Sequence, residues 1–287
     1  MDSNKKKRKV SLVVISDIHL GTYGCHAKEL LSYLKSINPD TVILNGDIID
    51  VWQFSKRYWP KSHMKIIKYI FGWISQGKEI YYITGNHDEI MRKFVDFEIG
   101  SFSIKNKVVL ELGSKKAWFF HGDVFDVTMQ HSKWLAKLGA VGYDTLILIN
   151  RGVNFISKFL GKGKISLSKK IKDSVKSAVK FINDFEDTAI NIAIDNKYDY
   201  VICGHIHKPA IKKVENDNGS VTYLNSGDWV ENLTALEYHK NKWSIYKYND
   251  DDFKKSKSKI KDEEEDVIDK SAKQLFGELV ADFYLKK

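Results

Sequence analysis

The feature that most constrains the fold is a series of short apolar runs rich in β-forming residues, with amphipathic segments between the first three. The runs cover residues 12–16, 41–45, 80–84, 117–120 and 200–203. Between the first two, apolar residues recur on one helical face, and Pro39 helps to end the helix. The residues on this face are Ala27, Leu30, Leu31, Leu34 and Ile37. Buried strands joined by helical crossovers form βαβ units, so the sequence predicts an α/β fold.

The remainder of the chain divides into further segments. Apolar and polar residues alternate in runs 221–224, 234–239 and 243–248, which are broken by Gly219, Gly227 and Asn241. This pattern predicts antiparallel strands. Residues 127–196 show helical periodicity and predict an inserted helical cap. We therefore expect a basic tail over 1–10, a main domain over 11–248 with the insert inside it, and a charged linker with a C-terminal helix over 249–287.

Composition narrows the classes of protein. The 287 residues include 43% hydrophobic and 13% aromatic residues, which excludes wholesale disorder. Only two cysteines occur, Cys25 and Cys203, and no uncharged apolar stretch is long enough for a membrane span, which predicts a reducing cytoplasmic setting. The net charge of +9 favours anionic partners such as phosphates, nucleic acid or an acidic membrane surface. Residues 5–10 match a nuclear-import pattern, or form a solvated basic tail.

Polar motifs follow each of the five apolar runs. They supply Asp17 and His19, then Asp47, then Asn86 with His87 and Asp88, then His121 and Asp123, and finally His205 and His207. The carboxyl ends of strands in open sheets are where ligand crevices form. Unpaired polar groups are costly when buried, so packing alone does not account for five such motifs. The pattern predicts one shared polar site with metal-ligating character.

These motifs resemble those of the calcineurin-like metallophosphoesterases, and the likeness covers roughly residues 11–248. The resemblance implies a four-layer αββα sandwich with two divalent metal ions about 3.5–4 Å apart. By motif, Asp17, His19 and His207 would bind one ion. Asn86, His121 and His205 would bind the other, and Asp47 would bridge the pair. The mixed oxygen and nitrogen ligands suit Mn²⁺, with Fe or Zn as alternatives.

The resemblance also implies a reaction. Two cations would bind phosphate oxygens and activate a water as hydroxide for in-line attack on the phosphorus. His87 would assist the leaving oxygen as an acid or stabilise the phosphorus centre, with Asp88 orienting it. A helix N-cap is the alternative role for Asp88. Asp123 is expected near the ligands or simply in a turn.

Within that family the chain is most similar to the UDP-2,3-diacylglucosamine pyrophosphatases of bacterial lipid A synthesis. The likeness rests on chain size, on Asp50 and Trp52, and on the helical insert. It implies cleavage of the substrate to 2,3-diacylglucosamine 1-phosphate and UMP, with the insert covering the acyl chains. The expected acyl contacts are Trp134, Phe155 and Phe159, and the expected diphosphate contacts are Lys164, Lys169 and Lys170. Simple packing of the insert and solvated lysines are the alternative.

One position departs from that group and keeps other functions open. His87 follows the Asn ligand, whereas the best-known pyrophosphatases of this type carry arginine there and general phosphoesterases carry histidine. The alternatives are a general phosphodiesterase or a nuclease, and a non-catalytic scaffold that keeps the metal fold. A lipid substrate would favour a cytoplasmic protein in peripheral contact with the inner membrane. The sequence does not predict an oligomeric state.

Overall fold

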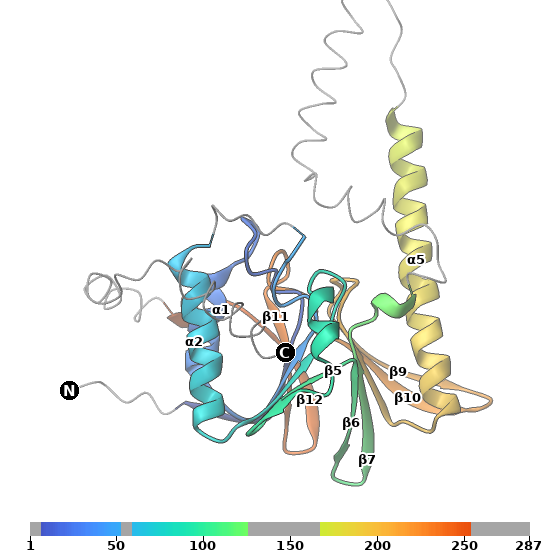
Figure 1. The fold of residues 1–287 in the computed structure, drawn as a ribbon. Coiled ribbons are helices and arrows are strands. Elements are labelled where there is room, and N and C mark those ends of the chain that lie inside the picture. The colour runs from blue at the N-terminus through green and yellow to red at the C-terminus, as the bar shows by residue number, and fades with distance from the viewer. Residues whose placement is uncertain (1–6, 53–58, 126–166, 254–287) are drawn as a thin grey trace, which may run out of the picture. The chain divides into compact units, whose positions relative to one another are not determined.

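The computed structural model describes residues 7–52, 59–125 and 167–253. The chain forms two compact units, residues 1–122 with 193–287, and residues 123–192. The first unit contains two β-sheets (Figure 1).

A seven-stranded sheet is built around four parallel strands. These are β1 (Arg8–Ile15), β2 (Ile37–Asn45), β3 (Glu79–Ile83) and β5 (Phe102–Lys105). Antiparallel strands extend the sheet on both sides. On one side β11 (Thr234–His239) pairs with β1 and β12 (Lys242–Lys247) pairs with β11, and on the other side β4 (Glu98–Ile99) pairs with β5. The sheet order is β12-β11-β1-β2-β3-β5-β4. The parallel strands therefore end at one common edge.

A five-stranded sheet has the order β6-β7-β8-β10-β9. Its central strands β7 (Lys115–Phe120), β8 (Tyr200–Cys203) and β10 (Gly219–Asn225) run parallel. The edge strands β6 (Lys107–Leu112) and β9 (Ala210–Asn216) pair antiparallel with β7 and β10. The carboxyl ends of β7 and β8 also lie at one edge.

Two apolar layers hold the first unit together. Val13 of β1 packs in one core cluster with Leu30 of α1 (Ala27–Ser36) and Ile66 of α2 (Lys61–Ser75). The next residue, Val14, packs instead with Phe119 and other residues of the second sheet. Successive side chains on a strand face opposite ways, so a strand buried on both faces must be apolar throughout. Each such side chain stabilises the fold by about 1.5–3 kcal/mol.

The predicted α/β sandwich is confirmed, with three corrections near its start. Ile37 does not end α1, because its extended backbone (φ −114°, ψ 158°) begins β2 and pairs with Arg8. Pro39 lies inside β2, in a stretch that pairs with β1 but not with β3, whose register begins opposite Thr41. A proline is tolerated there because no neighbour needs its missing N–H. Residues 8–10 likewise belong to β1 rather than to a tail.

The later strands also differ from the prediction. The predicted antiparallel run divides between the sheets: β10 pairs parallel with β8, whereas β11 and β12 form an antiparallel pair in the other sheet. β4, β5, β6 and β9 were not predicted. β4 has two residues, and β9 alternates between buried or half-buried and exposed positions at the sheet edge.

The second unit contains η2 (Asp123–Phe125) and most of α5 (Leu167–Asp195). Its buried rings Phe125 and Phe185 meet edge to face, with centroids 5.5 Å apart. Residues 126–166 and 254–287 lie outside the described residues, and with them Trp134, Phe155, Phe159, Lys164 and the predicted C-terminal helix. Lys169 and Lys170 fall on α5, where only the backbone is described. None of the described helices is long and apolar enough to cross a membrane.

Candidate metal centre

The predicted ligands follow the carboxyl ends of five strands. Asp17 comes two residues after β1 and Asp47 two residues after β2, while Asn86 follows β3. His121 directly follows β7, and His205 and His207 follow β8. Since these strands are parallel within each sheet and the sheets pack on each other, their ends supply side chains to one place.

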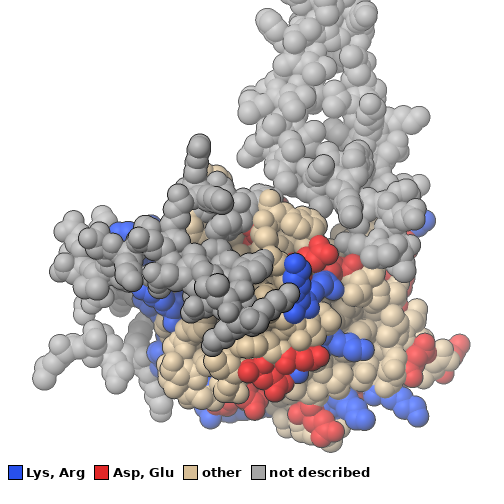
Figure 2. Space-filling model, in the orientation of Figure 1, with Lys and Arg blue, Asp and Glu red and all other residues tan. Residues whose placement is uncertain are grey.

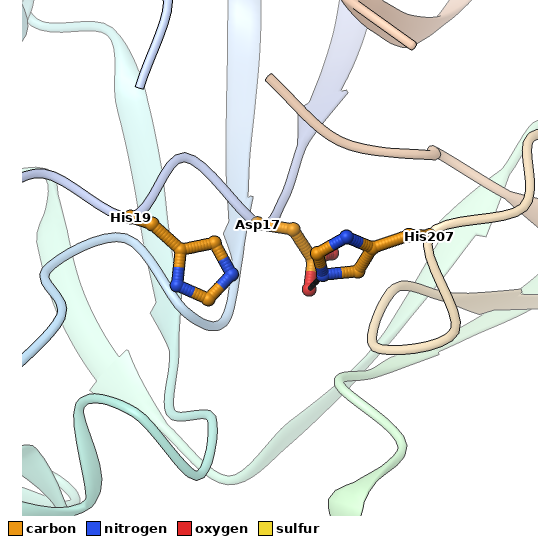
Figure 3. A group of neighbouring side chains, drawn as sticks. All are labelled: Asp17, His19 and His207. Atoms are coloured by element: carbon orange, nitrogen blue, oxygen red, sulfur yellow. Dashed lines mark ion pairs between the residues drawn. The ribbon is translucent and has the colours of Figure 1, made fainter. Parts of the chain in front are cut away.

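The structure brings six of the seven predicted ligands into two groups. Asp17, His19 and His207 form the first group (Figure 3). Asp47, His121 and His205 form the second. In each group, every residue offers one oxygen or nitrogen atom, and these atoms lie within 4.8 Å of one another. Three oxygen or nitrogen atoms this close together can coordinate one divalent cation.

Several of these residues adopt the left-handed backbone conformation that side chains normally avoid. The residues are Asp17 (φ 51°), His19 (φ 53°), Asp47 (φ 54°), His205 (φ 66°) and His207 (φ 51°). Such strain costs about 1–3 kcal/mol per residue and persists only where the surroundings enforce it. Here two hydrogen bonds join the segments that follow β1 and β2: the N–H of Asp17 donates to Gly46 O and the N–H of His19 donates to Asp47 O, both at 3.0 Å.

Two glycines allow the strand ends to approach closely. A Cβ atom at Gly85 would lie 2.6 Å from the backbone nitrogen of Asp47 and would collide with its carboxylate. A Cβ atom at Gly204 would lie 2.7 Å from Asp17 Oδ2. Both positions therefore require glycine so that the two carboxylates can occupy the site.

The first group joins a carboxylate to an imidazole. Asp17 Oδ1 lies 3.1 Å from His207 Nε2, and Asp17 Oδ2 accepts the backbone N–H of His205 at 3.1 Å. Burial alone would raise the pKa of Asp17, but His207, together with His121, outweighs burial and lowers it. Burial lowers the pKa of His207, but Asp17, followed by Asp228, raises it to about 9. In the absence of metal, the two side chains therefore stabilise each other as an ion pair.

The second group has the same character. Asp47 Oδ2 lies 3.2 Å from His121 Nε2, and Asp47 Oδ1 accepts the backbone N–H of His87 at 2.8 Å. Burial opposes ionisation of Asp47, but His121, with His19 and His87, outweighs burial and holds the pKa of Asp47 below its ordinary value. His121 Nδ1 lies 2.9 Å from the carbonyl oxygen of Asn45, which can only accept. The hydrogen must be on Nδ1, which leaves Nε2 as the ligand atom.

The residues present fit a metal ion. Within the described part of the chain, the buried polar atoms without a hydrogen-bond partner include two proposed ligand atoms, His19 Nε2 and Asn86 Oδ1. A buried polar atom without a partner costs about 1–3 kcal/mol, and a cation that binds it removes that cost. Asn86 directly precedes His87, whose backbone N–H donates to Asp47 Oδ1 at 2.8 Å.

The carboxylate that contacts His87 belongs to Asp50. Asp50 Oδ2 lies 2.8 Å from His87 Nδ1 and 3.1 Å from His19 Nδ1. Burial lowers the pKa of His87, but the hydrogen bond to Asp50 and the charge of Asp47 raise it above its ordinary value. The exposed ring of Trp52 packs on His87, with centroids 4.5 Å apart. Asp50 and Trp52 carried the resemblance in the sequence, but neither was predicted to be a site residue.

The prediction that Asp88 orients His87 is corrected. The two oxygens of Asp88 are used elsewhere: Oδ1 accepts the N–H of Gly85 at 2.6 Å, and Oδ2 accepts the N–H of Ile48 at 3.0 Å and the hydroxyl of Tyr82 at 2.5 Å. Asp88 precedes the 3₁₀ helix η1 (Glu89–Phe94), but its side chain makes no capping hydrogen bond. Asp88 instead ties the turn after β2 to the turn after β3, which carry Asp47 and Asn86.

A buried histidine supports the loop that follows His19. His63 Nδ1 accepts the N–H of Gly21 at 3.0 Å, so this nitrogen must be unprotonated. Burial lowers the pKa of His63 to about 4. This contact could not be predicted from the sequence, because it joins α2 to a loop about forty residues earlier. Asp123 belongs to η2 of the second unit.

An α/β sandwich with carboxylate, imidazole and amide donors at its strand ends defines a metal-dependent hydrolase of the phosphoesterase class. The chain belongs to the calcineurin-like phosphoesterase family, whose sequence profile matches residues 10–209. The predictions of family, fold class and hydrolase activity are thereby confirmed.

Relatives with curated names align with this chain over most of their length. A UDP-2,3-diacylglucosamine hydrolase of Vibrio cholerae is 27% identical over 244 residues, which cover 79% of this chain and 93% of the relative. A protein of the same name from Aliivibrio fischeri is 22% identical over 244 residues, covering 83% and 98%. Among solved structures, the Escherichia coli phosphoesterase YfcE aligns over 83% of this chain and 93% of its own, with 13% identity and a TM-score of 0.41.

Proposed function

We propose that this protein is a two-metal phosphoesterase that hydrolyses a phosphodiester or pyrophosphate. Asp17, His19 and His207 would hold one ion, and Asn86, His121 and His205 the other. Asp47 would bridge them. The observation that carries the proposal is the presence of two separate donor groups, one with Asp17 and one with Asp47, at the ends of adjacent strands β1 and β2. We propose Mn²⁺ as the metal, because the ligand set mixes oxygen and nitrogen donors.

The bound ions would supply Lewis-acid stabilisation of the phosphate oxygens and an activated water. The chain itself would supply the proton for the leaving oxygen. His87 Nδ1 is held by Asp50, so Nε2 is the nitrogen left to act on substrate. The N–H of His87 also donates to Asp47 Oδ1 at 2.8 Å, which ties the histidine to the proposed bridging carboxylate. His87 would thus act at a fixed position beside both ions.

We propose UDP-2,3-diacylglucosamine as the substrate, with 2,3-diacylglucosamine 1-phosphate and UMP as products. The support is the name of the curated relatives and the share of their length that this chain covers, 93% for the Vibrio cholerae protein. Two sets of substrate contacts stay predictions from the sequence. The acyl chains would contact Trp134, Phe155 and Phe159, and the diphosphate would contact Lys164, Lys169 and Lys170. Peripheral contact of a cytoplasmic protein with an acidic membrane surface also stays a prediction from the sequence.

A general phosphodiesterase is the second candidate. Its support is His87, because a histidine oriented by a buried carboxylate can serve many phosphoesters. A nuclease would be expected to present a continuous basic surface. On the face shown in Figure 2, the described lysines and arginines are interspersed with acidic residues. The described residues of this face therefore give no support to a nuclease.

One experiment separates these candidates. The Mn²⁺-loaded protein is assayed in parallel against UDP-2,3-diacylglucosamine, bis-p-nitrophenyl phosphate and cyclic nucleotides. We expect hydrolysis of all activated diesters at a low rate and a kcat/KM for the nucleotide-sugar lipid that is higher by orders of magnitude. Comparable values across the three classes would support the general phosphodiesterase. No hydrolysis of any of them would contradict the phosphoesterase proposal.

A further inference from the structure

The loop 227–232 connects β10 of the five-stranded sheet to β11 of the seven-stranded sheet. Its organising residue is Asp228, whose side chain is entirely buried. Asp228 Oδ1 accepts the backbone N–H groups of Val230 at 2.8 Å, Glu231 at 2.5 Å and Asn232 at 3.2 Å. Asp228 Oδ2 accepts the side-chain amide of Asn232 at 2.5 Å. The carboxylate therefore fixes both the path of the loop and the position of Asn232.

The same loop reaches two members of the first group. The amide of Asn232 also donates to the carbonyl oxygen of His207 at 2.8 Å. The N–H of Trp229 donates to the carbonyl oxygen of Asp17 at 3.0 Å, and Trp229 O accepts the N–H of His26 at 3.0 Å. Within the described residues, each side-chain hydrogen bond of Asp228 and Asn232 ends inside the loop or on His207.

These contacts meet a specific requirement of the first group. His207 and Asp17 both have a φ of 51°, a conformation that needs support from neighbouring atoms. Hydrogen bonds to their carbonyl oxygens supply such support. Asp228 Oδ2 also lies 4.0 Å from His207 Nδ1, and a negative charge there favours a hydrogen on Nδ1. His207 Nε2, which lies 3.1 Å from Asp17 Oδ1, is then the nitrogen available to a cation.

We propose that Asp228 and Asn232 are positioning residues that hold His207 at the first metal ion and leave the second ion unaffected. The inference rests on the proposed two-metal centre and adds to it a loop that supports only one of the two ions. A purely structural loop would behave differently, because its loss would destabilise the chain without discriminating between the two ions.

The test is metal binding by metal-free protein, measured by calorimetric titration with Mn²⁺ and by metal analysis after desalting. Asn232→Ala is the main variant, since Asn232 is only half-buried. Asp228→Asn is the second, because it keeps the shape of the side chain and removes its charge. Asn216→Ala is the matched control: Asn216 Oδ1 accepts the N–H groups of Asn218 and Gly219 in the turn between β9 and β10. Unfolding of each metal-free protein is recorded to verify the fold.

We expect the wild type and Asn216→Ala to bind two ions per chain. Asn232→Ala and Asp228→Asn should bind one ion normally and the other about 10- to 100-fold more weakly, the usual effect of residues behind a metal ligand. The paramagnetic resonance spectrum should change from that of coupled ions to that of an isolated Mn²⁺. Two ions bound with wild-type affinity in a folded Asn232→Ala protein, or equal weakening of both, would overturn the inference. Failure of the wild type to bind two ions would instead refute the proposed function.

Discussion

Asp50 Oδ2 lies 2.8 Å from Nδ1 of His87, so one buried carboxylate sets the orientation of the proposed acid. The same oxygen lies 3.1 Å from Nδ1 of His19, and the rings of His19 and His87 meet edge to face, with centroids 4.6 Å apart. A proposed ligand and the proposed acid thus share one support. A change at Asp50 should therefore affect both metal binding and turnover.

Asp50→Asn keeps the shape of the side chain but removes the negative charge between two imidazoles. We expect kcat to fall about 10- to 100-fold and the affinity for one ion to fall within a similar range. Titration with Mn²⁺ and steady-state kinetics at saturating metal measure the two effects separately. A variant with unchanged kcat and metal affinity would show that Asp50 does not position either histidine.

His87→Ala should retain both ions, because the assignment gives His87 a role on the substrate and none on the metal. Turnover should fall about 10²- to 10⁴-fold, the usual contribution of a general acid or base. Metal analysis of the purified variant accompanies the kinetics. Loss of metal would make His87 a ligand, and an unchanged rate would leave it a structural role only.

The insert provides a test of the substrate. If Phe155 and Phe159 bind acyl chains, the Phe155→Ala/Phe159→Ala protein should lose about ten- to a hundred-fold in kcat/KM per ring for the acylated nucleotide sugar. Hydrolysis of bis-p-nitrophenyl phosphate should barely change, because this substrate has no acyl chain. Metal content and unfolding temperature are checked first. Equal losses on the two substrates would assign these rings to packing of the insert.

His63 predicts a pH dependence of stability. Burial lowers the pKa of His63 to about 4 in the folded protein, from 6.5 when exposed. Below pH 6.5 the unfolded chain takes up a proton that the folded protein resists, so the free energy of unfolding falls as the pH drops from about 6.5 to about 4. The slope reaches up to about 1.4 kcal/mol per pH unit.

Denaturant unfolding of metal-free protein between pH 7 and 4 measures this slope. His63→Gln removes the titrating group and should flatten the dependence by up to one proton. His26→Gln removes an exposed histidine and serves as the control. If His63→Gln keeps the wild-type slope, another group is responsible for the loss of stability in acid.

The strand ends that carry the ligands could be predicted from the sequence, because β1, β2, β3, β7 and β8 are apolar and each leads into a polar motif. The edge strand β9 could not, because Lys212, Lys213 and Glu215 interrupt its apolar pattern. The helix was predicted to end near Pro39, but β2 already begins at Ile37. A break in the helical pattern does not reveal where the next strand begins.

Contacts between distant loops account for the remaining differences at the site. Asp50 and Asp88 both follow a ligand closely, and no spacing rule distinguishes the one that reaches His87 from the one that braces the turns. Asp228 acts on His207 from a loop that joins the two sheets, which only the folded chain brings together. The left-handed conformations of Asp17 and His207 could not be predicted from the sequence either, because only a glycine indicates such a position.

Metal content of the wild type and of Asp47→Ala tests the central claim most directly. Asp47 lies in the second group, with Oδ2 3.2 Å from the ligand atom His121 Nε2 and Oδ1 accepting the N–H of His87. We expect two ions per chain and hydrolysis of bis-p-nitrophenyl phosphate in the wild type, and loss of both in Asp47→Ala. An Asp47→Ala protein that keeps two ions and a near-normal rate would contradict the two-metal assignment.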